Sequence, residues 1–235
     1  MSMTAEFPAI HVWSAKLDVP RADQEGLAEC LSAPERERVS HYKFEYDRRK
    51  FVVRSGVRRR ILSSYLDGAA PAQIAFKVTN FGKPSLDAPH DQSGLHFNSS
   101  DSGERSLYAF TLRRDLGIDI EAVRPLPDAE KLAQRYFSPE EIKILLARKG
   151  HAREEYFFRI WSRKEAILKT VGVGLSGNLQ RIDVSTPEEC SADWTPLDYV
   201  SHLPMMWRDL VVESGYSAAL AVSGESGGVA HFDWV

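Results

Sequence analysis

The stretch from Phe157 to Lys169, FFRIWSRKEAILK, constrains the fold of this chain more than any other. Read at helical period, its apolar residues form one stripe that must face a core. The stripe comprises Phe157, Ile160, Trp161, Leu168 and Val171. Residues four positions apart lie one turn above each other, so Trp161, Glu165 and Lys169 form a row along the border of this stripe. Lys164 falls inside the stripe and must either extend its ammonium to solvent or meet a buried partner.

The segment GIDIEAV at residues 117–123 has the alternation of a strand. Its carboxylates, Asp119 and Glu121, point to one face, and Ile118 and Ile120 point to the other. Carboxylates two positions apart on a strand are about 6–7 Å apart and repel unless a positive charge lies between them. The pair could lie on a solvated strand face, or it could bind a hard cation such as Mg²⁺, which prefers carboxylate oxygens. The spacing alone leaves both possibilities open, as it does for the Glu165–Lys169 pair, which an ordinary amphipathic helix also produces.

Composition narrows the class of protein. The chain has 235 residues, of which 43% are hydrophobic and 27% charged, as is typical of a soluble globular protein. A net charge of −3 argues against a surface that coats nucleic acid. Cys30 and Cys190 are too few for a disulfide framework. No apolar run approaches the ~20 residues that span a bilayer, and no signal segment is recognisable. We therefore expect a cytoplasmic protein without a membrane partner.

A strongly basic segment lies at residues 48–60 of this acidic chain. Its basic residues are Arg48, Arg49, Lys50, Arg54, Arg58, Arg59 and Arg60. Such a run can be a solvated helix face, a nucleic-acid patch or a local anion site. No recognised nucleic-acid module surrounds it. Arg54 and Arg58 stack one turn apart and Arg49 lies close to the same face, as a ligand with several phosphates requires.

The remaining periodicity predicts an alternation of helices and strands without internal repeats. The predicted helices cover residues 22–32, 34–40, 46–66, 128–136, 138–148 and 152–170. The predicted strands cover residues 10–13, 74–78, 94–99, 105–112, 117–123, 179–185, 196–203, 207–213 and 216–223. Residues 84–93, rich in Pro, Asp and His, are expected to form a loop. This order suggests two α+β halves joined near residues 111–116.

Four short blocks occur in a fixed order along the chain. They are Gly82-Lys83-Pro84, then Phe97-Asn98-Ser99-Ser100, then the Asp119/Glu121 strand, then Trp161-Ser162-Arg163-Lys164-Glu165-Ala166 with Lys169 and Gly172-Val173-Gly174-Leu175. Each block alone is a weak signal. Together, over about residues 82–175, they resemble the Sfp-type 4′-phosphopantetheinyl transferases, and the basic segment resembles the N-terminal helix of that family. No comparable motif follows residue 180.

The resemblance implies an α+β fold of two similar α/β halves in a pseudo-twofold arrangement with a ligand cleft between them. We expect residues 1–114 to form an N-terminal half with the basic helix and coenzyme A phosphate contacts. Residues 115–235 would form a C-terminal half with the metal site and the catalytic helix. We expect a monomer whose partners are coenzyme A and a carrier protein, with no nucleic acid.

The resemblance also implies an activity. The enzyme would transfer the 4′-phosphopantetheine arm of coenzyme A to a serine of an apo acyl or peptidyl carrier protein, with Mg²⁺ or Mn²⁺, releasing 3′,5′-ADP. Asp119, Glu121 and Glu165 would hold the metal, Glu165 would take the serine proton, and Lys169 would balance the diphosphate charge or protonate the leaving group. The expected coenzyme A contacts are Arg49, Arg54, Lys83, Pro84, Ser100, Asp101, Asp119 and Lys169.

One residue departs from the family pattern. Asp101 occupies the position where the family commonly has a histidine near the 3′-phosphate. An ionised aspartate repels a phosphate, so Asp101 must turn away, pair with an arginine, or contact the ribose or adenine. A degenerate coenzyme A or nucleotide-binding protein and a metal-dependent phosphohydrolase remain alternative functions.

The sequence does not decide whether the carrier serves fatty acid, polyketide or nonribosomal peptide synthesis. We expect the carrier to dock on residues 124–148, where the candidate contacts are Arg135, Tyr136, Phe137 and Leu145.

Overall fold

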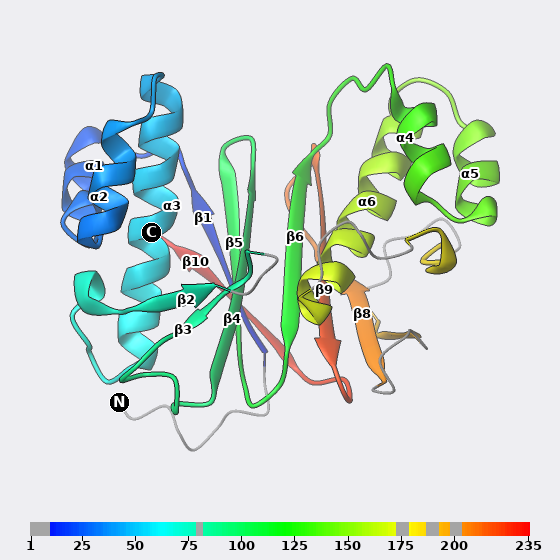
Figure 1. Ribbon diagram of the computed structural model, residues 1–235. Helices are drawn as coiled ribbons and strands as arrows, with labels where there is room; N and C mark the ends of the chain where they lie inside the picture. The colour runs from blue at the N-terminus through cyan, green and yellow to red at the C-terminus, as the bar shows by residue number, and fades with distance from the viewer. Residues whose placement is uncertain (1–9, 79–81, 173–178, 187–192, 198–203) are drawn as a thin grey trace.

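Two four-stranded sheets lie between two groups of helices (Figure 1). The computed structural model describes residues 10–78, 82–172, 179–186, 193–197 and 204–235. In each half, one helix of 21 residues packs on the sheet: α3 (Glu45–Tyr65) in the first and α6 (His151–Val171) in the second. The predicted α+β class with two similar halves is therefore confirmed.

The first sheet has the strand order β10-β1-β5-β4. Its strands are β1 (Ile10–Lys16), β4 (Leu95–Ser102), β5 (Arg105–Leu112) and β10 (Val229–Trp234). The helices beside it are α1 (Arg21–Ala28), α2 (Ala33–Ser40) and α3, and a small hairpin is formed by β2 (Phe76–Val78) and β3 (Pro84–Leu86). Val53, Val57 and Ile61 of α3 pack against Tyr108 and Phe110 of β5 to form the core of this half.

The second sheet has the order β6-β9-β8-β7, with antiparallel neighbours throughout. Its strands are β6 (Leu116–Ala122), β7 (Thr195–Leu197), β8 (Met205–Asp209) and β9 (Tyr216–Ser223). Its helices are α4 (Ala129–Tyr136), α5 (Pro139–Leu146) and α6. Phe157, Ile160 and Leu168 are at most 2% exposed, so the apolar stripe of α6 faces the core as predicted.

A separate apolar core joins the two sheets. Ile118 and Ile120 of β6 are buried there with Val12 of β1 and with Leu107 and Ala109 of β5. Since neighbouring strand residues point to opposite faces, Asp119 and Glu121 face away from this core, on the side of α6. The alternation predicted for residues 117–123 is confirmed.

The C-terminal strand crosses to the first half. β10 pairs in parallel with β1, with Ile10 opposite Val229 and Ala15 opposite Trp234. No strand was predicted at residues 229–234. The division of the chain at residues 114 and 115 remains a prediction, and the last strand belongs to the first sheet.

Two other expected elements differ from the structure, and a third lies partly outside the described residues. The predicted strand at 179–185 is a 3₁₀ turn, Leu179–Arg181, followed by irregular backbone. The loop predicted at 84–93 contains β3, which pairs with β2. Of the strand predicted at 196–203, residues 198–203 lie outside the described part, as do Val173, Gly174 and Leu175 of the fourth block. Among the described residues, no helix combines the length and the apolar character needed to cross a membrane.

Two of the four residues expected to contact a carrier are buried. Phe137 and Leu145 are 0% exposed, because both pack in the core of the second half. Their assignment to a docking surface was wrong. Arg135 is exposed and Tyr136 is half-buried, so both remain accessible to a partner.

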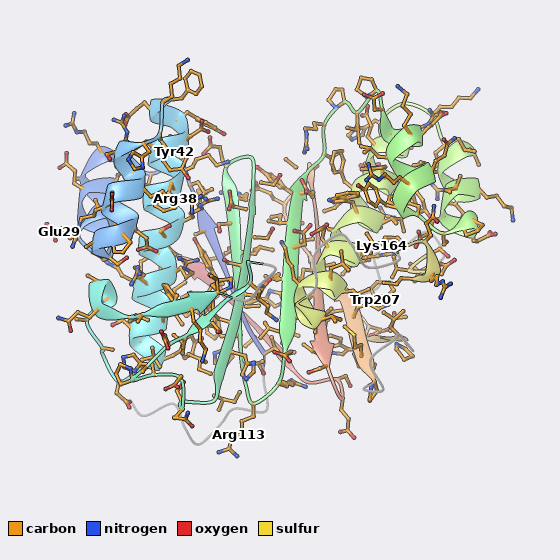
Figure 2. The ribbon with its side chains drawn as sticks, in the orientation of Figure 1. Glu29, Arg38, Tyr42, Arg113, Lys164 and Trp207 are labelled. Atoms are coloured by element: carbon orange, nitrogen blue, oxygen red, sulfur yellow. The ribbon has the colours of Figure 1, made fainter. Side chains whose placement is uncertain are left out.

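Lys164 meets a buried partner. Its Nζ lies 2.8 Å from Oε2 of Glu141 and donates to the carbonyl oxygens of Leu179 and Ile182. Figure 2 labels Lys164, on α6, among the side chains of the second half. Of the two possibilities for this lysine, the buried ion pair is the one that the structure shows.

Candidate active site

Gly117 brings β6 and α6 close together. A Cβ at this position would lie 2.1 Å from the carbonyl oxygen of Ala166 and 2.5 Å from the amide nitrogen of Thr170. Only glycine permits this approach without a backbone shift. The contact places Asp119, two residues along β6, beside the last turns of α6, which carry Glu165 and Lys169.

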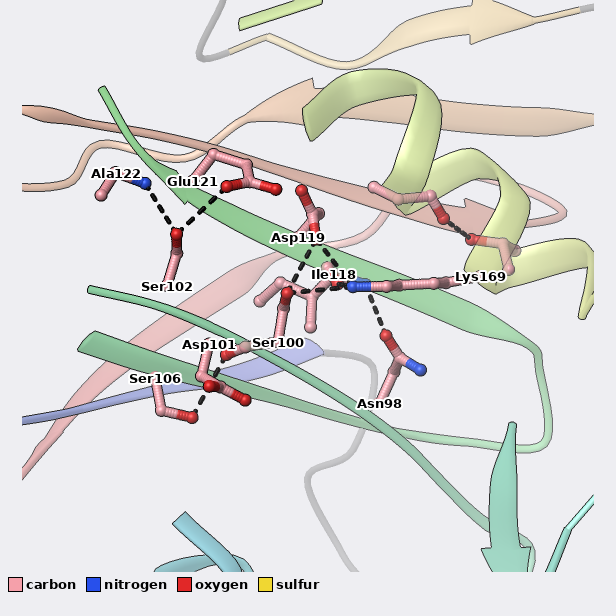
Figure 3. A network of polar contacts seen from close by, with 12 residues as sticks. Asn98, Ser100, Asp101, Ser102, Ser106, Ile118, Asp119, Glu121, Ala122 and Lys169 are labelled. Atoms are coloured by element: carbon pink, nitrogen blue, oxygen red, sulfur yellow. Dashed lines mark hydrogen bonds and ion pairs between the residues drawn. The ribbon is translucent and has the colours of Figure 1, made fainter. Parts of the chain in front are cut away.

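Lys169, Asp119 and Ser100 form a closed triangle of polar contacts (Figure 3). Lys169 Nζ lies 2.7 Å from Asp119 Oδ1 and donates to Ser100 Oγ at 2.9 Å. Ser100 Oγ in turn donates to the same Asp119 oxygen at 2.7 Å. The side chains come from α6, β6 and β4, so this cluster joins both halves of the protein.

Glu121 is held by a neighbour that sequence reasoning missed. Ser102 Oγ donates to Glu121 Oε2 at 3.1 Å, and the exposed Arg124 guanidinium lies 3.5 Å from the same oxygen. Ser102 is two residues beyond Ser100 on β4, so the alternation of the strand places both hydroxyls on one face. That spacing is the signal by which Ser102 could have been found.

The three carboxylates of the site influence one another. Burial chiefly raises the pKa of Asp119, and Lys169 and Ser100 oppose this rise. Burial raises the pKa of Glu165, and the charge of Asp119 raises it further against the opposing charge of Lys169. Burial also raises the pKa of Glu121, with Asp119 adding to it. Such a set of mutually repelling, partly desolvated acids is typical of a functional site.

One atom of this cluster suits a cation. Asp119 Oδ2 is buried and has no hydrogen-bond partner among the described residues, a costly arrangement that a bound cation would relieve. In the described part of the chain, however, no three His, Cys, Asp or Glu side chains converge closely enough to hold a metal as they stand. Lys169 supplies the positive charge beside Asp119 instead. The ligand set Asp119, Glu121 and Glu165 therefore remains a prediction.

Asp101 faces the other side of β4 and pairs with an arginine. Its Oδ1 lies 2.6 Å from Arg54 Nη1, and Lys50 Nζ lies 4.0 Å from its Oδ2. Of the three arrangements considered for this residue, the arginine pair is the one observed. The Asp101 carboxylate thus neutralises part of the positive charge that Arg54 was expected to offer to a phosphate.

The other expected coenzyme A contacts are dispersed around the site. Arg49 forms ion pairs with Asp18 and, at 3.0 Å, with Glu104. Lys83 Nζ donates to the carbonyl oxygens of Leu116 and Thr170, each at 3.2 Å, and so ties its loop to β6 and α6. Burial lowers the pKa of Lys83, and Asp115 opposes this.

A cavity of about 450 Å³ lies beside β4 on the side of α3. Arg54, Pro84 and Asp101 line it, together with Arg58 and Phe76. Nothing in the sequence indicated that Phe76 would line a cavity. Ser99 and Asp101 face this cavity whereas Ser100 and Ser102 face the carboxylates, so one strand serves both places. A larger cavity of about 1080 Å³ is lined by Ile120 and thus lies on the opposite face of β6 from the carboxylates.

Comparisons with known proteins cover nearly the whole chain. Residues 115–220 match a family model described as the 4′-phosphopantetheinyl transferase superfamily. Residues 19–111 match one described as 4′-phosphopantetheinyl transferase, N-terminal. The 4′-phosphopantetheinyl transferase HetI of Nostoc sp. is 36% identical over 216 residues, which cover 92% of this chain and 88% of HetI.

More distant relatives include 4′-phosphopantetheinyl transferase Sfp of Bacillus subtilis. It is 27% identical over 214 residues, which cover 90% of this chain and 92% of Sfp. The solved structure of a holo-(acyl-carrier-protein) synthase from Bacillus anthracis, in complex with CoA, matches with a TM-score of 0.39 and 19% identity. That match covers 48% of this chain and 96% of the synthase chain.

Proposed function

Because the chain belongs to the 4′-phosphopantetheinyl transferase superfamily, we propose that it moves the 4′-phosphopantetheine arm of coenzyme A to a serine of an apo acyl or peptidyl carrier protein and releases 3′,5′-ADP. The observation that carries this proposal is the cluster of Asp119, Ser100 and Lys169, with Glu121 and Glu165 beside it. The packing of the two sheets does not itself require so many charged groups where β4 and β6 meet.

The residues fit the demands of phosphoryl transfer. This reaction needs positioning, neutralisation of charge and removal of a proton from the nucleophile, with little covalent help from the protein. The Lys169 ammonium would neutralise charge on the diphosphate. Glu165 would accept the serine proton, directly or through water, and the burial that raises its pKa makes its carboxylate a stronger base for this role.

Asp119, Glu121 and Glu165 would hold Mg²⁺, or Mn²⁺ in its place. The unpartnered Asp119 Oδ2 supports this proposal. When bound, the metal would neutralise the negative charge of the diphosphate and of the departing 3′,5′-ADP. Hard cations of this kind bind carboxylate oxygens together with substrate phosphates rather than closed protein cages.

We propose that coenzyme A follows β4. Its diphosphate would lie near Ser100, Lys169 and Asp119, and its nucleotide would enter the 450 Å³ cavity beside Arg54, Pro84 and Asp101. Arg49 and Lys83 would line the approach. Several arginines of α3 are already paired with carboxylates, which supports a small anionic ligand over a nucleic acid as the partner of this helix.

Mass spectrometry of an apo carrier protein incubated with coenzyme A and Mg²⁺ tests the proposed function. We expect the carrier serine to gain one phosphopantetheine arm, and 3′,5′-ADP to form in equal amount. Chelation of divalent cations should abolish the reaction, and Mg²⁺ or Mn²⁺ should restore it. Release of phosphopantetheine without its attachment to the carrier would indicate a phosphohydrolase, and full transfer in chelator would exclude the metal role.

Charge reversal at Arg135 tests the docking surface that remains after Phe137 and Leu145 are excluded. Arg135 is exposed at the end of α4, and a carrier with acidic residues around its serine would meet it first. Arg135→Glu should raise the KM for the carrier about tenfold and leave the KM for coenzyme A unchanged. The rise should disappear above about 0.15 M salt, where the charges are screened. Arg21→Glu, at an exposed position of α1 outside residues 124–148, is the control. A defect confined to coenzyme A would place the docking surface elsewhere.

Three further expectations remain proposals. We propose that residues 1–114 and 115–235 act as the two functional halves, with β10 completing the first sheet. We also propose a monomer that acts in the cytoplasm, where the buried, unpaired Cys30 would stay reduced. Size-exclusion chromatography with light scattering tests the monomer directly.

A further inference from the structure

The two sheets meet edge to edge without a backbone ladder. β4 is the last strand of the first sheet and β6 is the first strand of the second, and the two are not paired. The outward N–H groups of β6 therefore need partners other than a neighbouring strand. Three side chains of β4, at alternate positions, reach across this joint (Figure 3): Asn98, Ser100 and Ser102.

Two of these side chains replace bonds of the missing ladder. Asn98 Oδ1 accepts from the N–H of Ile118 at 3.0 Å, and Ser102 Oγ accepts from the N–H of Ala122 at 3.0 Å. They hold β6 on both sides of the carboxylates Asp119 and Glu121. The position of these carboxylates relative to the first half is thus set by side chains of β4.

Ser102 makes a second bond that Asn98 does not make. A serine hydroxyl has one proton to donate, and here it donates to Glu121 Oε2 at 3.1 Å. Arg124 lies near the same oxygen, but its side chain is 55% exposed, and such a pair contributes little in water. Ser102 therefore holds the Glu121 carboxylate more firmly than Arg124 does.

We propose that Ser102 is a positioning residue, which orients the Glu121 carboxylate beside Asp119 by binding the Ala122 amide and the Glu121 side chain at once. This inference rests on the proposed function, in which Glu121 holds the divalent cation. A group that orients a ligand of a metal typically alters metal affinity or activity about 10- to 100-fold when it is removed.

Mn²⁺ binding to the full-length protein, measured by electron paramagnetic resonance with and without coenzyme A, tests this role. Ser102→Ala should weaken Mn²⁺ binding about tenfold and lower kcat to a similar extent, with a smaller effect on the KM for coenzyme A. Ser102→Thr keeps the hydroxyl and should restore most of both values. In a Glu121→Gln background, Ser102→Ala should add little further loss, because the two residues act through one carboxylate.

Ser14→Ala is the matched control. Ser14 Oγ also donates to a carboxylate on a neighbouring strand, that of Asp233, but away from the carboxylate cluster. It should change neither Mn²⁺ binding nor kcat. If Ser102→Ala does not fold, Ser102→Cys, which keeps a weaker donor, is measured in its place.

Two outcomes would overturn the role of Ser102. One is Mn²⁺ binding that is the same in the wild type and Ser102→Ala, even if the variant is less stable to heat. The other is a wild-type protein that binds no Mn²⁺ with or without coenzyme A. A wild type that binds Mn²⁺ in a Ser102-dependent manner but modifies no carrier would instead refute the proposed function and leave the positioning role supported.

Discussion

Replacing Asp119 with asparagine should lower kcat about a thousandfold, equivalent to about 4 kcal/mol of transition-state stabilisation. Asp119 is the acid at the centre of the cluster, where Lys169 and Ser100 both bind its Oδ1, and its Oδ2 has no partner in the part of the chain that the structure describes. An amide keeps the volume and one acceptor oxygen but lacks the negative charge. It can neither hold a divalent cation firmly nor balance the Lys169 ammonium.

The fold should survive this change. The ammonium that Asp119→Asn leaves without its counter-ion is 28% exposed, so water can solvate it, and it still reaches the carbonyl oxygen of Ile118. We expect the free energy of unfolding to change by about 1 kcal/mol. Asp233→Asn, on β10, is the control and should retain full activity. Carrier modification by Asp119→Asn at the wild-type rate would exclude Asp119 from the chemistry.

Local patterns predicted the elements that carry the site. The alternation of residues 117–123 placed Ile118 and Ile120 in a core and Asp119 on the opposite face, because a strand has a period of two wherever one face is buried. The helical row of Glu165 and Lys169 followed in the same way from the period of α6. These parts depend only on neighbours in sequence, and the structure confirms them.

Local sequence patterns could not predict contacts between segments that are distant in the chain. β10 pairs with β1 across more than two hundred residues, and nothing in the sequence VAHFDW indicates that partner. Asp101 had three possible arrangements, and only the tertiary position of Arg54 decides among them. Phe137 illustrates the same limit, since an apolar residue at a helix end can fill a core or a docking surface with equal propensity.

The ion pair between Lys169 and Asp119 is the most informative feature that the sequence could not reveal. The four-residue row predicted that Lys169 lies near Glu165, whereas its ammonium contacts the acid on β6. Because a cation already lies beside Asp119, a divalent metal and coenzyme A would have to compete with it or draw it toward the diphosphate. We therefore expect the metal and coenzyme A to bind with positive coupling. The metal would neutralise Asp119 when the Lys169 ammonium moves to the diphosphate, and the diphosphate would give that ammonium a new counter-ion.

Lys164→Met should lower the free energy of unfolding by about 3–5 kcal/mol, although methionine fits the volume of the lysine stem. The sequence alone allowed Lys164 either to extend to solvent or to meet a buried partner. The structure shows the buried pair, because Lys164 is 1% exposed and its partner Glu141 is 0% exposed. Removing the ammonium leaves a carboxylate buried without its counter-ion, and no solvent can reach it.

Two further hydrogen bonds hold the Glu141 carboxylate in place beside the position of the missing ammonium. Its Oε2 accepts from the Ser138 N–H at 2.7 Å, which caps α5, and its Oε1 accepts from the Val184 N–H at 2.8 Å. The double variant Lys164→Met/Glu141→Gln should therefore recover much of the lost stability, since glutamine can keep one of these bonds without a charge. Denaturant unfolding of the single and double variants measures both effects.

Activity separates this lysine from Lys169, five residues further along α6. At a temperature where every variant is folded, Lys164→Met should retain kcat, because its ammonium contacts α5 and two backbone carbonyls rather than the carboxylate cluster. Lys169→Met should lower kcat at least tenfold, because its ammonium contacts Asp119 and Ser100. A folded Lys164→Met protein that loses activity as Lys169→Met does would show that the two lysines serve the same site, against the separation that the structure indicates.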